Sequence, residues 1–230
     1  MKVTYEFTFD ESRKEAFELE FNEKNMSINP LPVGENEAWI QLEFHQCPDC
    51  PLKKDSSPYC PVARNLLPVL TRFRDDPSYI KVHTTVTMEA RTVERHGSLQ
   101  EGAYPLLGLI MATSGCPVLD RFKPMAFTHL PFANEDETLM RAVSNYLLAQ
   151  YIRMQHDKKP DWDLVGFEPM YARVEKINGA FIERFRDLSG RDANVNALLL
   201  LNIFAQLGSF SLNTNWMDKI IPFFSAYLEE

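Results

Sequence analysis

The amino-acid sequence predicts an α+β protein, in which an N-terminal antiparallel β-sheet is followed by helices. Alternation of apolar and polar residues occurs in the first half of the chain, whereas helical periodicity dominates the second half. The strands are expected before the helical run instead of alternating with helices, which is the order typical of α+β proteins. We therefore expect a strand-rich portion with one or two helices over residues 1–115 and an all-helical portion over residues 116–230, packed against each other as one compact unit.

Four segments are strand candidates. Residues 2–9 and 15–22 alternate on either side of the polar stretch DESRKE, and this pattern predicts a hairpin. The third candidate, AWIQLEFH at residues 38–45, leads almost directly into Cys47. The fourth is YIKVHTTVTMEARTV at residues 79–93, in which the apolar residues of the first half share one face.

Two capping boxes mark helix starts. Ser98 is followed three residues later by Glu101, and Asn134 by Glu137. In this pattern the first side chain accepts from a first-turn amide and the second reaches back to the capping residue. The boxes predict a helix over residues 99–113 and a long amphipathic helix after Asn134.

Proline, glycine and aspartate predict the ends of the other helices. Proline suits the first helical position, so Pro61 and Pro169 are each expected to begin a helix. Pro68 interrupts the first of these, and Gly190 ends the second. The remaining helices are expected over residues 193–207, capped by Asp192 and buried on several sides, and over residues 215–228.

Composition and charge limit the partners of the protein. The formal net charge is -8, and acidic residues dominate residues 1–46, whereas a nucleic-acid-binding surface needs clustered positive charge. The start of the chain lacks the pattern of an export signal, and the most apolar stretch, NALLLLNIFAQLGSFSL, is interrupted by polar residues and short for a bilayer. We expect a cytoplasmic protein without a nucleic-acid or membrane partner; a protein or small-molecule partner is left open.

The four cysteines carry the strongest chemical signal, because proline follows each of them: Cys47, Cys50, Cys60 and Cys116. Proline keeps the preceding residue extended and suits a helix start, where amides and the helix dipole lower the pKa of a thiol. The CxxC spacing lets two thiolates reach one ion, and the other two cysteines can complete a tetrahedron. We expect a structural or regulatory metal site, with zinc favoured and an iron–sulfur cluster as an alternative.

Two other interpretations of the cysteines stay open. Pro51 stands where familiar zinc knuckles have a glycine with positive φ, which disfavours an ordinary zinc ribbon. Cys47 and Cys50 could instead form a redox pair, or all four could be packed thiols of an interaction module. No nucleophile elbow, phosphate-binding loop or dinucleotide motif occurs, so the sequence does not predict an enzyme.

Five further residues are secondary candidates, each with an ordinary structural alternative. His129 and His45 could serve as replacement metal ligands, although a single hydrogen bond would also account for each. Arg64, Arg121 and Lys123 follow Cys-Pro pairs and could bind an anion, or could pair with acidic surface residues.

The segments CPDCPL, YCPVARNL and SGCPVLDRFKPMAFTHLPF together resemble an uncharacterised bacterial family, a domain of unknown function that spans most of this length. The resemblance implies bacterial origin and a cytoplasmic location. It carries no known activity and no catalytic residue.

Overall fold

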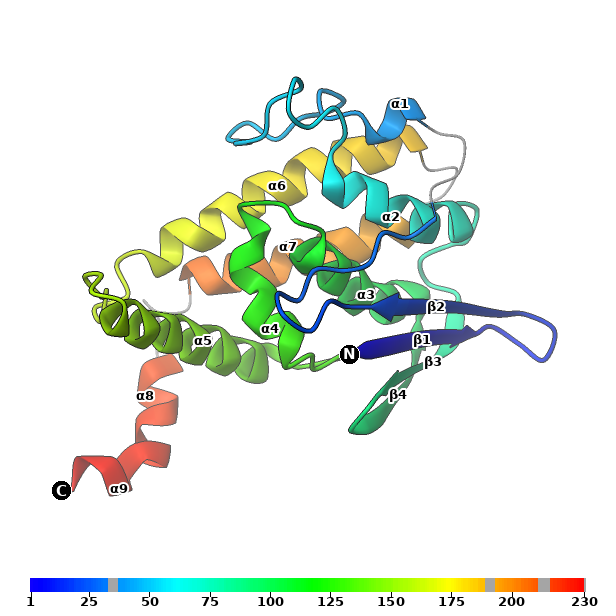
Figure 1. Cartoon of the computed structure of the whole chain (residues 1–230). Coiled ribbons are helices and arrows are strands. Elements are labelled where there is room, and N and C mark those ends of the chain that lie inside the picture. The colour runs from blue at the N-terminus through cyan, green and yellow to red at the C-terminus, as the bar shows by residue number, and fades with distance from the viewer. Residues whose placement is uncertain (33–36, 189–192, 211–215, 230) are drawn as a thin grey trace.

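The computed structural model describes residues 1–32, 37–188, 193–210 and 216–229. The strands within these residues form one antiparallel sheet. Four antiparallel strands lie in the order β2-β1-β3-β4 (Figure 1). They are β1 (Lys2–Thr8), β2 (Lys14–Glu20), β3 (Lys81–Met88) and β4 (Arg91–Ser98). The predicted hairpin and the α+β class are confirmed.

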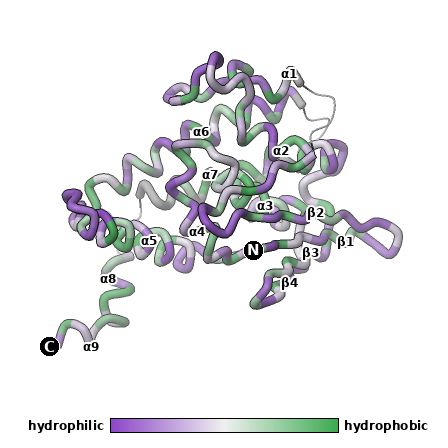
Figure 2. The backbone as a smooth tube through the Cα atoms, viewed as in Figure 1, coloured by the Kyte–Doolittle hydropathy of each residue, from purple (hydrophilic) through white to green (hydrophobic). Residues whose placement is uncertain are grey.

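One face of the sheet is buried because the central strands alternate. Val3, Tyr5 and Phe7 of β1 are fully buried, and Tyr5 pairs with Phe17 of β2 on one side and Val86 of β3 on the other. Inward apolar and outward polar residues are the usual pattern of a sheet covered on one face. Figure 2 shows the contrast with the hydrophilic turn between β1 and β2.

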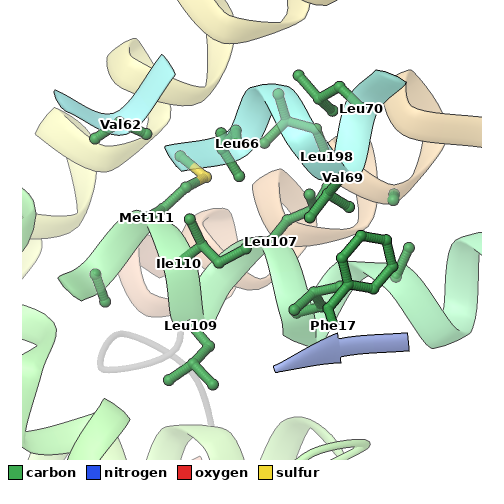
Figure 3. Close-up of a cluster of buried hydrophobic side chains, with 14 of the residues drawn as sticks. Phe17, Val62, Leu66, Val69, Leu70, Leu107, Leu109, Ile110, Met111 and Leu198 are labelled. Atoms are coloured by element: carbon green, nitrogen blue, oxygen red, sulfur yellow. The ribbon is translucent and has the colours of Figure 1, made fainter. Parts of the chain in front are cut away.

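Helix α3 (Leu99–Thr113) covers this face and forms the centre of the molecule. The Ser98 and Glu101 capping box is present as predicted. A Cβ added at Gly102 would lie 2.3 Å from Thr84 Oγ1 and 2.9 Å from the Phe7 ring, so glycine allows the helix to approach the sheet closely. On its other side, α3 packs against α2 (Pro61–Arg72), as Figure 3 shows.

Helices make up most of the described residues after α3. The long ones are α5 (Glu135–Gln155), α6 (Phe167–Leu188) and α7 (Ala193–Phe210), and the short ones are η1 (Leu119–Phe122), α4 (Lys123–Phe127), α8 (Trp216–Ile220), η3 (Ile221–Phe224) and α9 (Ser225–Leu228). The Asn134 and Glu137 box begins α5 as predicted. A second apolar cluster joins α5, α6 and α8. No helix within the described ranges has the length and apolar character needed to cross a membrane.

Two strand predictions are corrected by the structure. Residues 38–45 form no strand: α1 (Glu37–Ile40) is followed by turns, because the carbonyls of this segment turn inward to a buried arginine. Residues 79–93 contain β3, a turn at residues 89–90 and the start of β4. Strand β4 is mostly exposed, so it lacks the apolar alternation that would have revealed it.

Helix α7 packs against α3, α5 and α6, which confirms its predicted burial on several sides. Ala197 and Leu198 are fully buried, whereas Leu199 is 40% exposed and Ile203 is 50% exposed. The predicted end signals at Gly190 and Asp192 lie outside the described residues.

Candidate functional site

The cysteines come from three segments of the chain. Cys47 and Cys50 form a tight turn, in which the Cys50 amide donates to the Cys47 carbonyl at 3.1 Å. Cys60 has the extended conformation expected before proline, with φ -73° and ψ 117°, and stands directly before α2. Cys116 follows α3, three residues beyond its end at Thr113.

The fold brings these segments together over α6 (Figure 1). Cys47, Cys50 and Cys116 line one small pocket together with Arg173 and Ile177 of α6. The pocket has a volume of about 20 Å³, enough for one water-sized sphere.

The fourth cysteine, Cys60, lies close enough to the others for their charges to interact. As thiolates, Cys60, Cys50 and Cys116 each raise the pKa of Cys47. All four side chains are free thiols of intermediate exposure. The four predicted metal-site cysteines are therefore neighbours in space.

The sulfurs do not stand at coordination positions. Within the part of the chain that the structure describes, no group of three or more histidine, cysteine, aspartate or glutamate side chains is arranged to hold a metal ion. The arrangement is thus a cluster of adjacent thiols, and coordination by all four would require the segments to move closer.

The expected lowering of thiol pKa at the helix starts is wrong for Cys60 and Cys116. Hydrogen bonds from the backbone amides of Val62 and Ala63 favour the thiolate of Cys60. The amides two and three residues after Cys116 do the same for Cys116. Burial outweighs them and raises the pKa of both thiols. Burial first, and then the neighbouring sulfurs, raises the pKa of Cys47 to about 12. Without a cation, the thiol form of Cys47 therefore dominates at neutral pH.

A cation that the sequence interpretation missed lies beside the thiols. Arg184 of α6 is only 2% exposed. Its guanidinium donates to the main-chain carbonyls of Trp39, Gln41 and Phe44. Two of these residues, together with Phe181, also place their rings 5.3 to 5.6 Å from the guanidinium carbon.

Arg184 has no carboxylate partner in the described part of the chain. The groups whose negative charge would affect the pKa of Arg184 are the thiolates of Cys60, Cys47 and Cys50, with Cys60 having the largest effect. Burial lowers its pKa and these thiolates raise it. The spacing of Ile177, Phe181, Arg184 and Leu188 could have revealed it, because these positions share one helix face.

The two candidate histidines have other partners. His45 Nε2 lies 2.6 Å from a carboxylate oxygen of Asp187, near the end of α6. His129 Nε2 lies 2.6 Å from the Tyr5 hydroxyl, against the sheet. Neither histidine contributes to the pKa shifts of the cysteines, and their role as replacement ligands stays a prediction.

The three candidate anion-binding cations face different surroundings. Arg64 is exposed on α2, and Arg121 lies near Tyr146 of α5. Lys123 pairs with Asp120 at 3.0 Å and donates to Ser27 Oγ at 3.3 Å. In the described part of the chain these three side chains make no contact with one another, so their joint anion binding also stays a prediction.

His129 should make the protein sensitive to acid. Burial, and then the charge of Arg141, lower its pKa to about 3. A folded-state pKa below the unfolded value means that His129 favours folding above about pH 6.5 and that this contribution is lost as the pH falls toward 3. Between pH 7.5 and 4.5, wild type should lose about 2 kcal/mol more unfolding free energy than His129→Gln.

Urea unfolding of both proteins at the two pH values measures this difference. Glutamine can still accept the Tyr5 hydrogen bond but does not titrate. Equal losses in the two proteins would show that His129 is not held neutral by the fold.

With the site described, the chain can be placed among known proteins. It is an α+β protein whose Cys-Pro segments gather over α6. A family model described as a domain of unknown function (DUF6901) matches residues 3–220, and the chain belongs to this family. The expected membership of an uncharacterised family is thereby confirmed, while bacterial origin stays a prediction. Neither the curated proteins nor the solved structures yielded a match.

Proposed function

We propose that Cys47, Cys50, Cys60 and Cys116 hold a structural or regulatory metal, with zinc favoured over an iron–sulfur cluster. The observation that carries this proposal is the buried Arg184, whose charge acts on three of the four cysteines and, among the residues that the structure describes, on no carboxylate. An isolated buried cation is costly unless an anion compensates it. Metal-bound thiolates beside Arg184 would provide that anion.

The charges of such a centre fit their surroundings. Four thiolates around Zn²⁺ carry a net charge of about -2, since each thiolate is -1 and the ion is +2. Arg184 offsets part of this charge, and the amides at the start of α2 point toward Cys60 and offset more. Arg184 and these amides would therefore offset part of the charge of such a centre, against the burial that favours neutral thiols.

A bound cation would reverse part of the rise in the thiol pKa values. Repulsion among adjacent thiolates contributes to the raised pKa of Cys47. A bound dication would replace that repulsion with attraction and lower the pKa of each ligand, so metal binding would release protons.

The Cys47 to Cys50 turn can approach the other two cysteines because its tether is weak. Asp49 within the turn pairs with Lys176 of α6 at 2.6 Å, and both side chains are more than half exposed. Exposed pairs of this kind contribute about 0–1 kcal/mol. A small shift of the turn would therefore cost little compared with the free energy of binding a metal.

The redox alternative is less well supported. An attacking cysteine acts as a thiolate, and the raised pKa of Cys47 disfavours that form. The remaining alternative is that the four cysteines bind no metal and are packed, unreactive thiols. The experiment below distinguishes this alternative from the metal site.

Changing Cys116 to serine tests the proposal by linkage. If four thiolates hold a metal, chelation should lower the melting temperature of wild type by on the order of 5 °C. Cys116→Ser should show the lowered melting temperature before chelation and respond little to it. Differential scanning calorimetry with and without a chelator measures both effects.

Lys53→Ala is the matched control. Lys53 is exposed in the same segment of the chain, between Cys50 and Cys60, and its ammonium group cannot serve as a thiolate ligand. The control should keep the full chelator response. A wild-type melting temperature that ignores chelation, together with four unreactive thiols, would instead identify the cysteines as packed structural residues.

A further inference from the structure

A second candidate site lies in a cavity on the side of α3 that faces the C-terminal helices. The cavity has a volume of about 200 Å³ and lies among α3, α4, α5, α6 and α7. Most of its wall is apolar, including Leu109, Ala112, Leu119, Phe122 and Leu201. It shares no lining residue with the pocket beside the cysteines.

Arg141 of α5 places a cation in this wall. Its Nη2 donates to the carbonyls of Met125 and Thr128, each at 2.8 Å. Its Nε is buried and has no hydrogen-bond partner among the described residues. The nearby carboxylate of Glu137 accepts a hydrogen bond from the Asn134 amide at 2.8 Å, as part of the capping box, and forms no ion pair with Arg141. Arg141 therefore keeps unused donor capacity and forms no ion pair in the described chain.

Tyr171 of α6 contributes a second donor. It is 6% exposed, and its hydroxyl donates only to the Met125 thioether, at 3.9 Å. Sulfur of this type is a weak acceptor, so the hydroxyl can move to a better one. Its charge interaction with Arg141 shows that the two groups are close.

His129 supplies a third donor from the segment after α4. Tyr5 is fully buried, and its hydroxyl has no other acceptor among the described residues, so we assign the hydroxyl as the donor to His129 Nε2. In the neutral imidazole the proton then sits on Nδ1, which makes that nitrogen a donor. Donors from Arg141, Tyr171 and His129 thus line one largely apolar cavity.

We infer that this cavity binds a small apolar monocarboxylate, with the carboxylate on Arg141 and the hydrocarbon part against α3 and α7. Donors without matching acceptors suit an anion, and guanidinium groups match the geometry of a carboxylate. An apolar cavity of about 150 Å³ is known to hold benzene, so this volume suits one ring with a short chain. A few polar groups in an apolar pocket are the usual form of a small-molecule site.

A matched pair of probes tests the inference on wild-type protein. 3-Phenylpropanoate and its neutral amide have nearly the same shape and differ in charge. Titration calorimetry should show that the acid binds at least tenfold more tightly than the amide. Equal affinities, or no binding of the acid at millimolar concentration, would overturn the inference.

Variants assign the preference to one residue. Arg141→Met should remove the tenfold preference, and Arg141→Lys should keep part of it, since lysine retains the charge without the planar fork. Arg153→Met, a change at an exposed position of the same helix α5 outside the cavity, should keep all of it. If Arg141→Met folds and still prefers the acid as wild type does, Arg141 does not bind the carboxylate. If Arg141→Met does not fold, the inference is tested by Arg141→Lys and by the probe pair on wild type.

Discussion

Replacing Leu198 with aspartate should strongly destabilise the protein. Leu198 is fully buried in α7 and belongs to the same apolar cluster as Val69 and Leu70 of α2 (Figure 3). The described surroundings are apolar, so the new carboxylate would be buried without a partner. We expect a loss of about 4–5 kcal/mol, which is a large share of the 5–15 kcal/mol that stabilises a typical domain.

Leu199→Asp is the matched control for this prediction. The neighbouring side chain is 40% exposed, so its carboxylate can reach water. This change should cost about 1 kcal/mol or less. Urea unfolding followed by circular dichroism compares the two variants, and wild-type stability of Leu198→Asp would show that α7 is peripheral to the core.

Arg184→Met should have the second large effect. Methionine fills a similar space but leaves the carbonyls of Trp39, Gln41 and Phe44 without their donor. Each buried, unsatisfied group costs on the order of 1–3 kcal/mol, partly offset by relief from burying a cation, so we expect a net loss of roughly 3 kcal/mol. Metal affinity should also fall, because the compensating charge beside the cysteines is gone.

Arg186→Met controls for the loss of a cation from the same helix. Arg186 is exposed and pairs with Glu183 at 2.5 Å, so its replacement should change stability and metal affinity little. Unfolding free energy and competition with a chromogenic chelator measure both quantities. If Arg184→Met bound metal as tightly as wild type, the charge argument for the centre would fail.

Much of the fold could be predicted because its signals are local. The alternation around Tyr5 and Phe17 and the boxes at Ser98 and Asn134 depend on neighbouring residues alone. The segment around Trp39 could not be predicted in the same way. Its apolar residues suit a strand, but its carbonyls turn toward Arg184, which lies more than a hundred residues away.

The two candidate sites could be predicted only in part, because they too depend on contacts between residues that are far apart in the sequence. Shared Cys-Pro pairs suggested that the cysteines would meet, but their raised pKa values depend on burial, which spacing does not reveal. The second cavity joins Arg141, Tyr171 and His129 from three segments, and no motif links them. From the sequence, His129 was a candidate metal ligand or a residue with one ordinary hydrogen bond, and nothing linked it to Arg141 or Tyr171.

Elemental analysis of protein purified without a histidine tag, recorded alongside an absorption spectrum, tests the metal centre most directly. The account predicts about one zinc per chain and no visible absorption band. Iron with a visible charge-transfer band would retain the four-cysteine centre but replace zinc with a cluster. Protein that contains neither metal as isolated from cells, and that does not gain stability when zinc is added to the reduced form, would contradict the account.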